Sequence, residues 1–301
     1  MAARASRSAS RKARATEAVA TGPLGALSHD ELGVIFEGLA DPLQPVVAVA
    51  LSSTCLGLRT PLQAAIEVLK ERHERTVALC RKVGSPGCAA LRDAEVLLWI
   101  KQGLTADDMA TLAMILRTNG LPRLLQLYLG RNRFGDAGMQ ALCEGLGPGA
   151  APSLSTLDLS SNQFGPAGAE ALAAALRKGA LPKLEALGVG GNPFGNQGMA
   201  ALAEPLRKLH ALNALDLGNC ELGNEGVASL VAKLGKDDFK LGVLFINDNK
   251  ISDAGGATFV SAIDGAGLSD QLFWPGNPCS EATHQAVVDA LARAKARRAS
   301  S

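Results

Sequence analysis

One pattern recurs along most of the chain at a spacing of 28 to 30 residues, and a period of that length leaves few folds open. The shared form is L-x-x-L-x-L-x-x-N-x-h-G-x-x-G, where h is an apolar residue. Its first half alternates as a short strand does, and its glycine turn leads into apolar residues at helical spacing. Strong copies, such as LSTLDLSSNQFGPAG, begin at Leu124, Leu154, Leu184, Leu212 and Leu241, and weaker copies begin at Ala94 and Ser269.

The asparagine of the pattern has a structural role that its chemistry predicts. Its amide both donates and accepts hydrogen bonds, so it can satisfy backbone groups in the turn that leaves the strand. Successive copies should form a ladder, in which one copy has a cysteine that makes a weaker bond. The ladder positions are Asn132, Asn162, Asn192, Cys220, Asn249 and Asn277. Just after the turns come Asp136, Asn196, Asn224 and Asp253, which we expect to cap the helices that begin there.

The period and pattern resemble leucine-rich repeats. The long repeat, with cysteine replacing one asparagine, resembles the ribonuclease-inhibitor-like class, which includes ribonuclease inhibitor, Ran GTPase-activating protein and the recognition arrays of innate immune receptors. The resemblance covers residues 91–298 and implies an α/β horseshoe of about seven repeats, with parallel strands inside and helices outside. It implies protein recognition without naming a partner, because the class binds many unrelated proteins.

Strand positions that point away from the core would line the concave face of the horseshoe. The middle copy, GVGGNPFGNQG, places Gly188, Gly190 and Gly191 there, and such a bare strip often marks the close approach of another backbone. Random substitution at surface positions that tolerate any residue would leave the same run of glycines. We expect Asp158 and Asp216 to pair with a basic group of the partner, and the outer aromatic residues to anchor it. The predicted partner-binding residues are Tyr128, Arg131, Asp158, Gly188, Gly190, Asp216, Phe245 and Asp248.

Residues 24–90 lack the repeat and predict a helical unit. From Leu27 they read L-x-x-x-E-L-x-x-I-F-x-x-L, followed by an apolar helix. This resembles an F-box, the module that ties substrate receptors to the adaptor of Skp-cullin ubiquitin ligases. The chain departs from that family at Ser28, where the family prefers proline. The resemblance makes four residues the adaptor contacts: Leu32, Ile35, Phe36 and Leu39.

The alternative for this unit is a helical cap over the first repeat. Val96, Leu98 and Ile100 are apolar at strand positions that would otherwise face solvent. A cap would cover them, so the two interpretations stay open at this point.

The composition limits the partners and the cellular compartments that we expect for this chain. Residues 1–23 carry five basic residues and no acid before Glu17, as a disordered basic tail or an organellar transit peptide does. Lys plus Arg number 30 and Asp plus Glu 29, so we expect no nucleic-acid partner. The longest apolar run, near Val46–Leu51, is too short to cross a membrane. The six cysteines are scattered without a C-x-x-C pair, which favours reduced thiols in the cytoplasm or nucleus, or in an organelle if the tail is a transit peptide.

No catalytic pattern accompanies the repeats. The histidines fall in unrelated segments, and the glycine-rich stretch lacks both the G-x-G-x-x-G spacing and the lysine of nucleotide loops. Asp158 and Asp216 should lie about 10 Å apart on an open sheet without a pocket. We therefore predict a monomeric protein-recognition module without enzyme activity, metal or cofactor, and favour a ubiquitin-ligase substrate receptor. The alternatives are a small-GTPase regulator resembling the Ran activator, or a scaffold or inhibitor.

Overall fold

The structure is a computed structural model in which residues 35–36, 40–54, 56–118, 121–234, 241–265 and 269–299 are described. Within these ranges, side chains are described except at positions 51–61, 234, 270 and 298–299. The predicted tail of residues 1–23 and two of the expected adaptor contacts, Leu32 and Leu39, lie outside the described residues.

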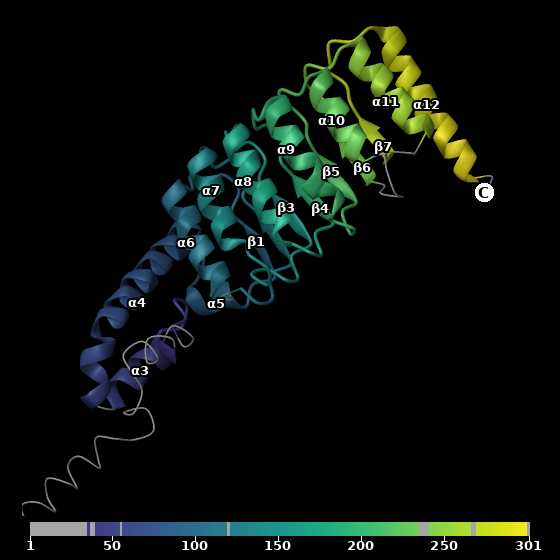
Figure 1. Ribbon diagram of the computed structural model, residues 1–301. Helices are drawn as coiled ribbons and strands as arrows, with labels where there is room; N and C mark the ends of the chain where they lie inside the picture. The colour runs from purple at the N-terminus through teal and green to yellow at the C-terminus, as the bar shows by residue number, and fades with distance from the viewer. Residues whose placement is uncertain are drawn as a thin grey trace, which may run out of the picture.

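A seven-stranded parallel sheet runs through the molecule in chain order, and a helix follows every strand. The strands form one layer and the helices lie side by side as a second layer (Figure 1), so the predicted α/β repeat fold is confirmed. The strands are β1 (Val96–Leu98), β2 (Gln126–Tyr128), β3 (Thr156–Asp158), β4 (Ala186–Gly188), β5 (Ala214–Asp216), β6 (Leu241–Phe245) and β7 (Ser269–Phe273). The helices that follow them are α6 (Ala106–Arg117), α7 (Gly135–Gly145), α8 (Pro166–Arg177), α9 (Gly195–Arg207), α10 (Asn224–Leu234), α11 (Asp253–Gly265) and α12 (Glu281–Ala299).

The register of the sheet aligns one leucine of each strand with that of the next. Leu127, for example, pairs with Leu97 on one side and Leu157 on the other, and all three are buried. Burying such a side chain contributes roughly 1.5–3 kcal/mol. A slip of one residue would turn the whole leucine row to solvent, so the core holds the register in place. The residues on either side of each leucine therefore face the opposite, concave side.

Asn162 shows how a rung of the asparagine ladder is made. Its Oδ1 accepts the backbone N–H groups of Asn132 and Arg133 at 2.9 and 3.1 Å. Its Nδ2 donates to the carbonyl oxygens of Leu129 and Leu159 at 3.0 and 2.9 Å. Each rung thus satisfies buried backbone groups of two neighbouring repeats. Corresponding bonds are made by Asn132, Asn192, Asn249 and Asn277.

Cys220 occupies the one rung without an amide. Its Sγ lies 3.5 Å from the carbonyl oxygen of Val189 and 3.4 Å from that of Gly218. Burial raises the pKa of this thiol to about 12, so the thiol keeps its proton and can donate. In the repeat before it, Pro193 follows Asn192, and proline has no N–H to satisfy. The side chain at this rung therefore has fewer backbone N–H groups to accept than an asparagine rung has. A cysteine can replace the amide here for that reason.

The polar residues after the turns cap the next helix along the array, so our expectation that they cap their own helices was wrong. Asp136 Oδ1 accepts the N–H groups of Gly165 and Gly168, both at 2.7 Å, where α8 begins. Asn196 likewise accepts the N–H of Gly223 at 2.7 Å, just before α10. Neighbouring helices start side by side, so the free N–H groups of one first turn lie against side chains of the helix before it. Two further residues make the same contact with the following repeat: Asn224 and Asp253.

The N-terminal helices form a unit with a small core of its own. In Figure 1, α4 (Leu56–Lys82) extends away from the array and α3 (Val46–Thr54) lies at its far end. The residues of this core are Phe36, Ala40, Ala48, Leu62 and Leu69. The core is separate from the main one, so the far half of the unit is stabilised by contacts within the unit.

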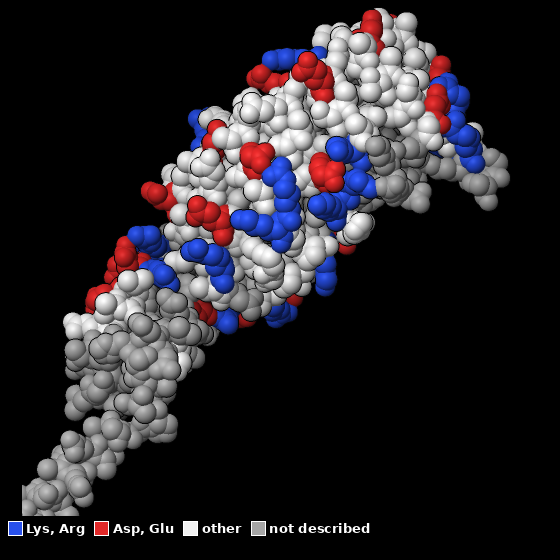
Figure 2. Space-filling view, viewed as in Figure 1, with Lys and Arg blue, Asp and Glu red and all other residues white. Residues whose placement is uncertain are grey.

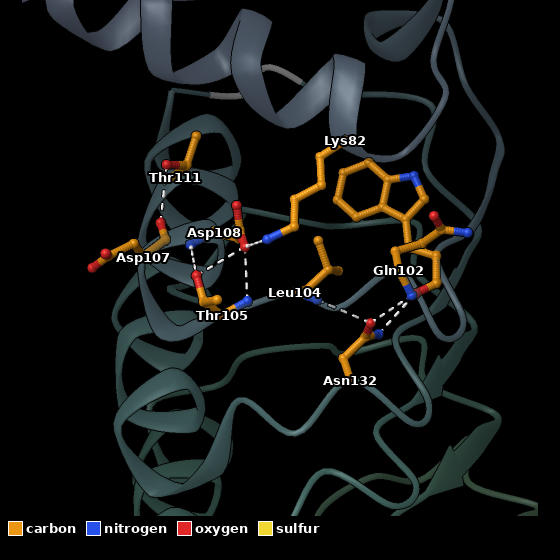
Figure 3. A network of polar contacts seen from close by, with 9 residues as sticks. Lys82, Gln102, Leu104, Thr105, Asp107, Asp108, Thr111 and Asn132 are labelled. Carbon is orange, nitrogen blue, oxygen red and sulfur yellow. Dashed lines mark hydrogen bonds and ion pairs between the residues drawn. The ribbon is translucent and has the colours of Figure 1, made fainter.

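The end of α4 and the short α5 (Cys88–Arg92) pack on the first repeat. Leu79 and Leu91 join the main core beside Leu97. A polar link adds to this contact (Figure 3): Lys82 Nζ lies 2.5 Å from Asp108 Oδ2, which also accepts the N–H of Thr105 at 2.7 Å. Burial raises the pKa of Asp108, but the hydrogen bonds from Lys82 and Thr105 outweigh it and lower the pKa on balance.

The unit does not cover the concave side of the first strand. Val96, Leu98 and Ile100 are 44%, 65% and 38% exposed, so the described part of the unit leaves these three side chains open to solvent. The reason is the alternation of the strand: the packed side chains are Leu97 and Trp99, which point to the opposite face.

Candidate protein-binding face

One row of side chains crosses the concave face from the first strand to the last. Strand pairing sets these residues next to one another, one from each strand. The row is apolar or aromatic at both ends and acidic or bare in the middle. Its members are Leu98, Tyr128, Asp158, Gly188, Asp216, Phe245 and Phe273.

The two aspartates of the row are held in place by their own turns. Asp158 Oδ1 accepts the N–H of Ser160 at 2.9 Å, and Asp216 Oδ1 accepts the N–H of Gly218 at the same distance. No ion pair to either carboxylate occurs among the described residues. Desolvation raises the pKa of Asp216, and the nearby charge of Asp158 adds to that rise. The pair is a partly desolvated, oriented site of negative charge.

The glycines give room to these carboxylates. A Cβ at Gly190 would lie 2.8 Å from Asp216 Oδ2, and one at Gly188 would lie 3.0 Å from Asp158 Oδ1. At Gly190 the free space is therefore occupied by a neighbour within the chain. A contact within the chain therefore accounts for the glycine at this position, and the sequence pattern did not show that contact.

Gly191 is explained by its backbone. Its φ is +71°, and its counterparts in other repeats also lie in the left-handed region. Arg131 and Asp248 are two of these counterparts, with φ of 61° and 54°, and both are exposed on turns above the row. Asp248 accepts a hydrogen bond from Asn247 Nδ2 at 2.6 Å. The two predicted contacts thus lie near opposite ends of the face.

The aromatic end of the row is larger than we expected. Phe245 stacks on Phe273, with ring centroids 4.7 Å apart and ring planes within 13°. Phe273 is 45% exposed, as a contact residue must be. The sequence interpretation missed it, although the 28-residue step from Phe245 was the signal that could have found it. At the other end it missed Leu98, beside the half-buried Tyr128.

The structure separates the two adaptor contacts that it describes. Ile35 is 37% exposed, whereas Phe36 is buried in the small core of the N-terminal unit. The assignment of Phe36 as an adaptor contact is therefore corrected, since a side chain in its own core cannot meet a partner without unfolding the unit.

The last repeat brings a cysteine and a histidine together. Cys279 Sγ lies 3.5 Å from His284 Nε2, and the imidazole packs edge-on against Trp274. Desolvation and the charge of Asp253 raise the pKa of Cys279. A nucleophilic cysteine needs a lowered pKa, so the raised pKa of Cys279 does not favour that role. Across the described ranges, no three His, Cys, Asp or Glu side chains are placed to hold a metal ion. None of the helices described there is long and apolar enough to cross a membrane.

Comparison with known proteins identifies the repeat. The leucine-rich repeat model matches residues 122–143, 150–173, 180–203 and 208–231. No curated protein matches the chain. Among solved structures, the tropomodulin C-terminal domain of Caenorhabditis elegans is 15% identical, with a TM-score of 0.40 over 63% of this chain and 95% of that one. Internalin C2 from Listeria monocytogenes is 19% identical, with a TM-score of 0.39 over 69% of this chain and 85% of that one. The four matched stretches are leucine-rich repeats, which generally mediate protein–protein interaction by presenting an extended concave surface.

Proposed function

We propose that the chain recognises a protein partner through the concave row described above. The observation that carries this proposal is the arrangement of that row, in which an uncompensated carboxylate pair lies between two apolar ends. Aromatic residues beside a polar centre are common anchors of protein interfaces. The partner that fits is an extended segment with a basic side chain at its middle and apolar side chains on both sides.

The basic group would lie between Asp158 and Asp216, over Gly188. One oxygen of each carboxylate is already bonded to a backbone N–H, so little side-chain freedom is lost on binding. Desolvation is the main cause of the raised pKa of Asp216, and the charge of Asp158 adds to it; a cation from the partner would stabilise the charged form against both. Tyr128 and the stacked Phe245 would then meet the apolar groups of the same segment.

The finer proposal is a substrate receptor of a Skp-cullin ubiquitin ligase. Its support is the separate core of the N-terminal unit, which lets that unit serve as an independent docking element. Val46 and Val47 of α3 are 73% and 58% exposed, and Ile35 is also exposed, so the unit presents apolar side chains. A small-GTPase regulator and a scaffold without a role in degradation are the competing functions.

The concave proposal is tested by capture from the native cell with matched variants. D158N/D216N removes the carboxylate pair, and E144Q/E281Q removes the same charge from the helical side. We expect the partner to be lost only with the first variant, and also with Gly188→Arg, whose side chain would displace Asp158 and meet the basic group. Equal capture by all four chains, each folded, would refute the concave assignment.

The receptor version has its own test. Ile35→Asp should abolish binding of a purified Skp-type adaptor while the repeats stay folded by circular dichroism. Normal adaptor binding by this variant would reject the receptor and leave the concave proposal standing. Capture of a small GTPase through the concave row would instead favour the regulator.

A further inference from the structure

The first strand, β1, lies at one end of the sheet and has a free edge. It pairs with β2 on one side, and no strand within the described ranges pairs with its other side. A free strand edge presents a row of N–H and C=O groups, which is a template for another strand. Proteins usually protect such an edge, so an edge without protection indicates a place for a partner.

The hydrogen bonds to β2 show which backbone groups of β1 remain free. Trp99 and Lys101 donate their N–H groups to carbonyl oxygens of the β2 repeat at 2.9 and 3.1 Å, and Glu95 accepts an N–H of β2 at 3.0 Å. Residues that bond to one neighbour alternate with residues that face the other side. The N–H and C=O groups of Val96 and Leu98 therefore point to the free edge, and in the described part of the chain they have no partner.

The side chains along this edge are aliphatic and open to solvent. Val96, Leu98 and Ile100 alternate along the strand, and all three are exposed on the concave side. Figure 2 shows acidic and basic side chains scattered together over the helical side of the array. The stretch 96–100, by contrast, has no charged residue and no proline. It therefore lacks the lysine or proline that commonly prevents an edge from pairing.

The charges at the two ends of β1 differ in sign. Lys101 and Arg131 occupy the same turn position in neighbouring repeats, and both are exposed. Neither forms an ion pair with another described residue. At the start of the strand, Asp93 is exposed and Glu95 pairs with Arg123 at 2.6 Å. The end of β1 is therefore the place that attracts an acidic group.

We infer that the free edge of β1 binds an extended segment of a partner protein, which pairs with β1 as an additional strand. The segment carries aliphatic side chains at alternate positions, and these pack beside Val96, Leu98 and Ile100 because paired residues of neighbouring strands share one face. An acidic residue of the segment lies next to Lys101. In this mode of binding, main-chain hydrogen bonds give affinity and alternate side chains give specificity.

The test uses the full chain and a labelled synthetic peptide, Glu-Val-Thr-Val-Thr-Val-Glu, whose binding is measured by fluorescence anisotropy. Leu98→Glu puts a charge among the aliphatic side chains and should weaken binding about tenfold or more. Val288→Glu changes an exposed aliphatic residue of α12 in the same way and should keep the affinity within about twofold. K101Q/R131Q should weaken binding about threefold and reduce its dependence on salt. Circular dichroism checks that each variant is folded.

Main-chain pairing is tested with two N-methylated forms of the peptide. Successive N–H groups of a strand point to opposite sides, so a methyl on the central valine blocks one side and a methyl on the next threonine blocks the other. One form should lose about tenfold or more in affinity, and the other should bind as the parent does. The form that loses affinity also gives the direction, because the valine N–H faces β1 in an antiparallel pair and the threonine N–H does so in a parallel one.

The inference is overturned if the peptide does not bind the native chain, or if the two N-methylated forms bind equally well. Equal losses with Leu98→Glu and Val288→Glu would also overturn it. Self-association that Leu98→Glu abolishes would assign the edge to a second copy of the chain instead. Peptide binding that requires removal of residues 1–23 would assign it to the chain's own N-terminal segment. D158N/D216N should bind the peptide normally, so failure here is distinguishable from failure of the concave proposal.

Discussion

The repeat array and the N-terminal unit are stabilised in different ways. In the array, each buried turn receives its hydrogen bonds from the repeats beside it, as at Asn162. The N-terminal unit has a small core, to which five of its described residues belong, and it meets the array through the end of α4, α5 and the link from Lys82 to Asp108. Each repeat of the array is therefore stabilised by its neighbours. The N-terminal unit depends on few contacts, so it can unfold while the array stays folded.

The largest effect should follow from breaking a rung of the ladder. Asn162→Leu leaves the buried N–H of Asn132 and the partly buried N–H of Arg133 without an acceptor, so we expect the free energy of unfolding to fall by about 4 kcal/mol. Gln163→Leu is the control, because Gln163 is exposed and changes should stay within about 0.5 kcal/mol. Urea denaturation measures both. Equal midpoints would contradict the coupling of repeats through this residue.

The next effect concerns the small core. Leu69→Ala removes a buried side chain from the unit and should destabilise that unit by about 2–3 kcal/mol. Hydrogen exchange should speed up in α3 and the first half of α4 and stay unchanged in β2 to β7. The neighbouring Val68→Ala, at an exposed site, should change little. Faster exchange throughout the array would show that the two regions unfold together.

A smaller loss is expected at the link between the regions. Lys82→Met removes the partner of Asp108 at a partly buried site and should cost about 1 kcal/mol. Because the folded-state pKa of Asp108 is lowered, this contribution is present above its ordinary pKa and disappears as the pH falls through the folded value. Lys70→Met, at an exposed pair with Glu67, is the control. If the ion pair between Lys82 and Asp108 adds no stability, thermal melts at neutral and acidic pH will show no difference between the variants.

The smallest effect should come from the concave face. The raised pKa of Asp216 means that the folded chain holds this proton more tightly than the unfolded chain does. Stability should therefore rise slightly as the pH falls through the raised pKa towards the ordinary one, and binding of a basic partner should weaken over the same range. D216N should remove both dependences. A pH profile that is unchanged in D216N would assign them to other groups.

The regular part of the fold could be predicted from the chain because its units are local and repeat. The leucines of L-x-x-L-x-L could only form strands with one apolar face, and the 28-to-30-residue period could only stack them. The placement of the half-buried Tyr128 and Asp158 on the concave face followed from the same register. Phe273 was missed because its copy of the pattern is degenerate.

The sequence pattern could not predict the contacts between repeats, because these contacts join residues about 30 positions apart. The carboxylate of Asp216 lies over Gly190, and Asp136 caps the helix of the next repeat. Each depends on side-chain direction across a stack, which the letters of one repeat do not specify. The same holds for Phe36, which looked like a contact residue and is buried.

By itself, then, the sequence determined the period, the strand register, the buried leucine row and the positions of the ladder, because these follow from the local alternation of apolar and polar residues. Only the tertiary structure decided that Val96 and Leu98 stay exposed and that the carboxylates fill the space above the glycines. The physical reason is that these features arise where neighbouring repeats meet, and the distances across that stack are set by packing rather than by the order of residues.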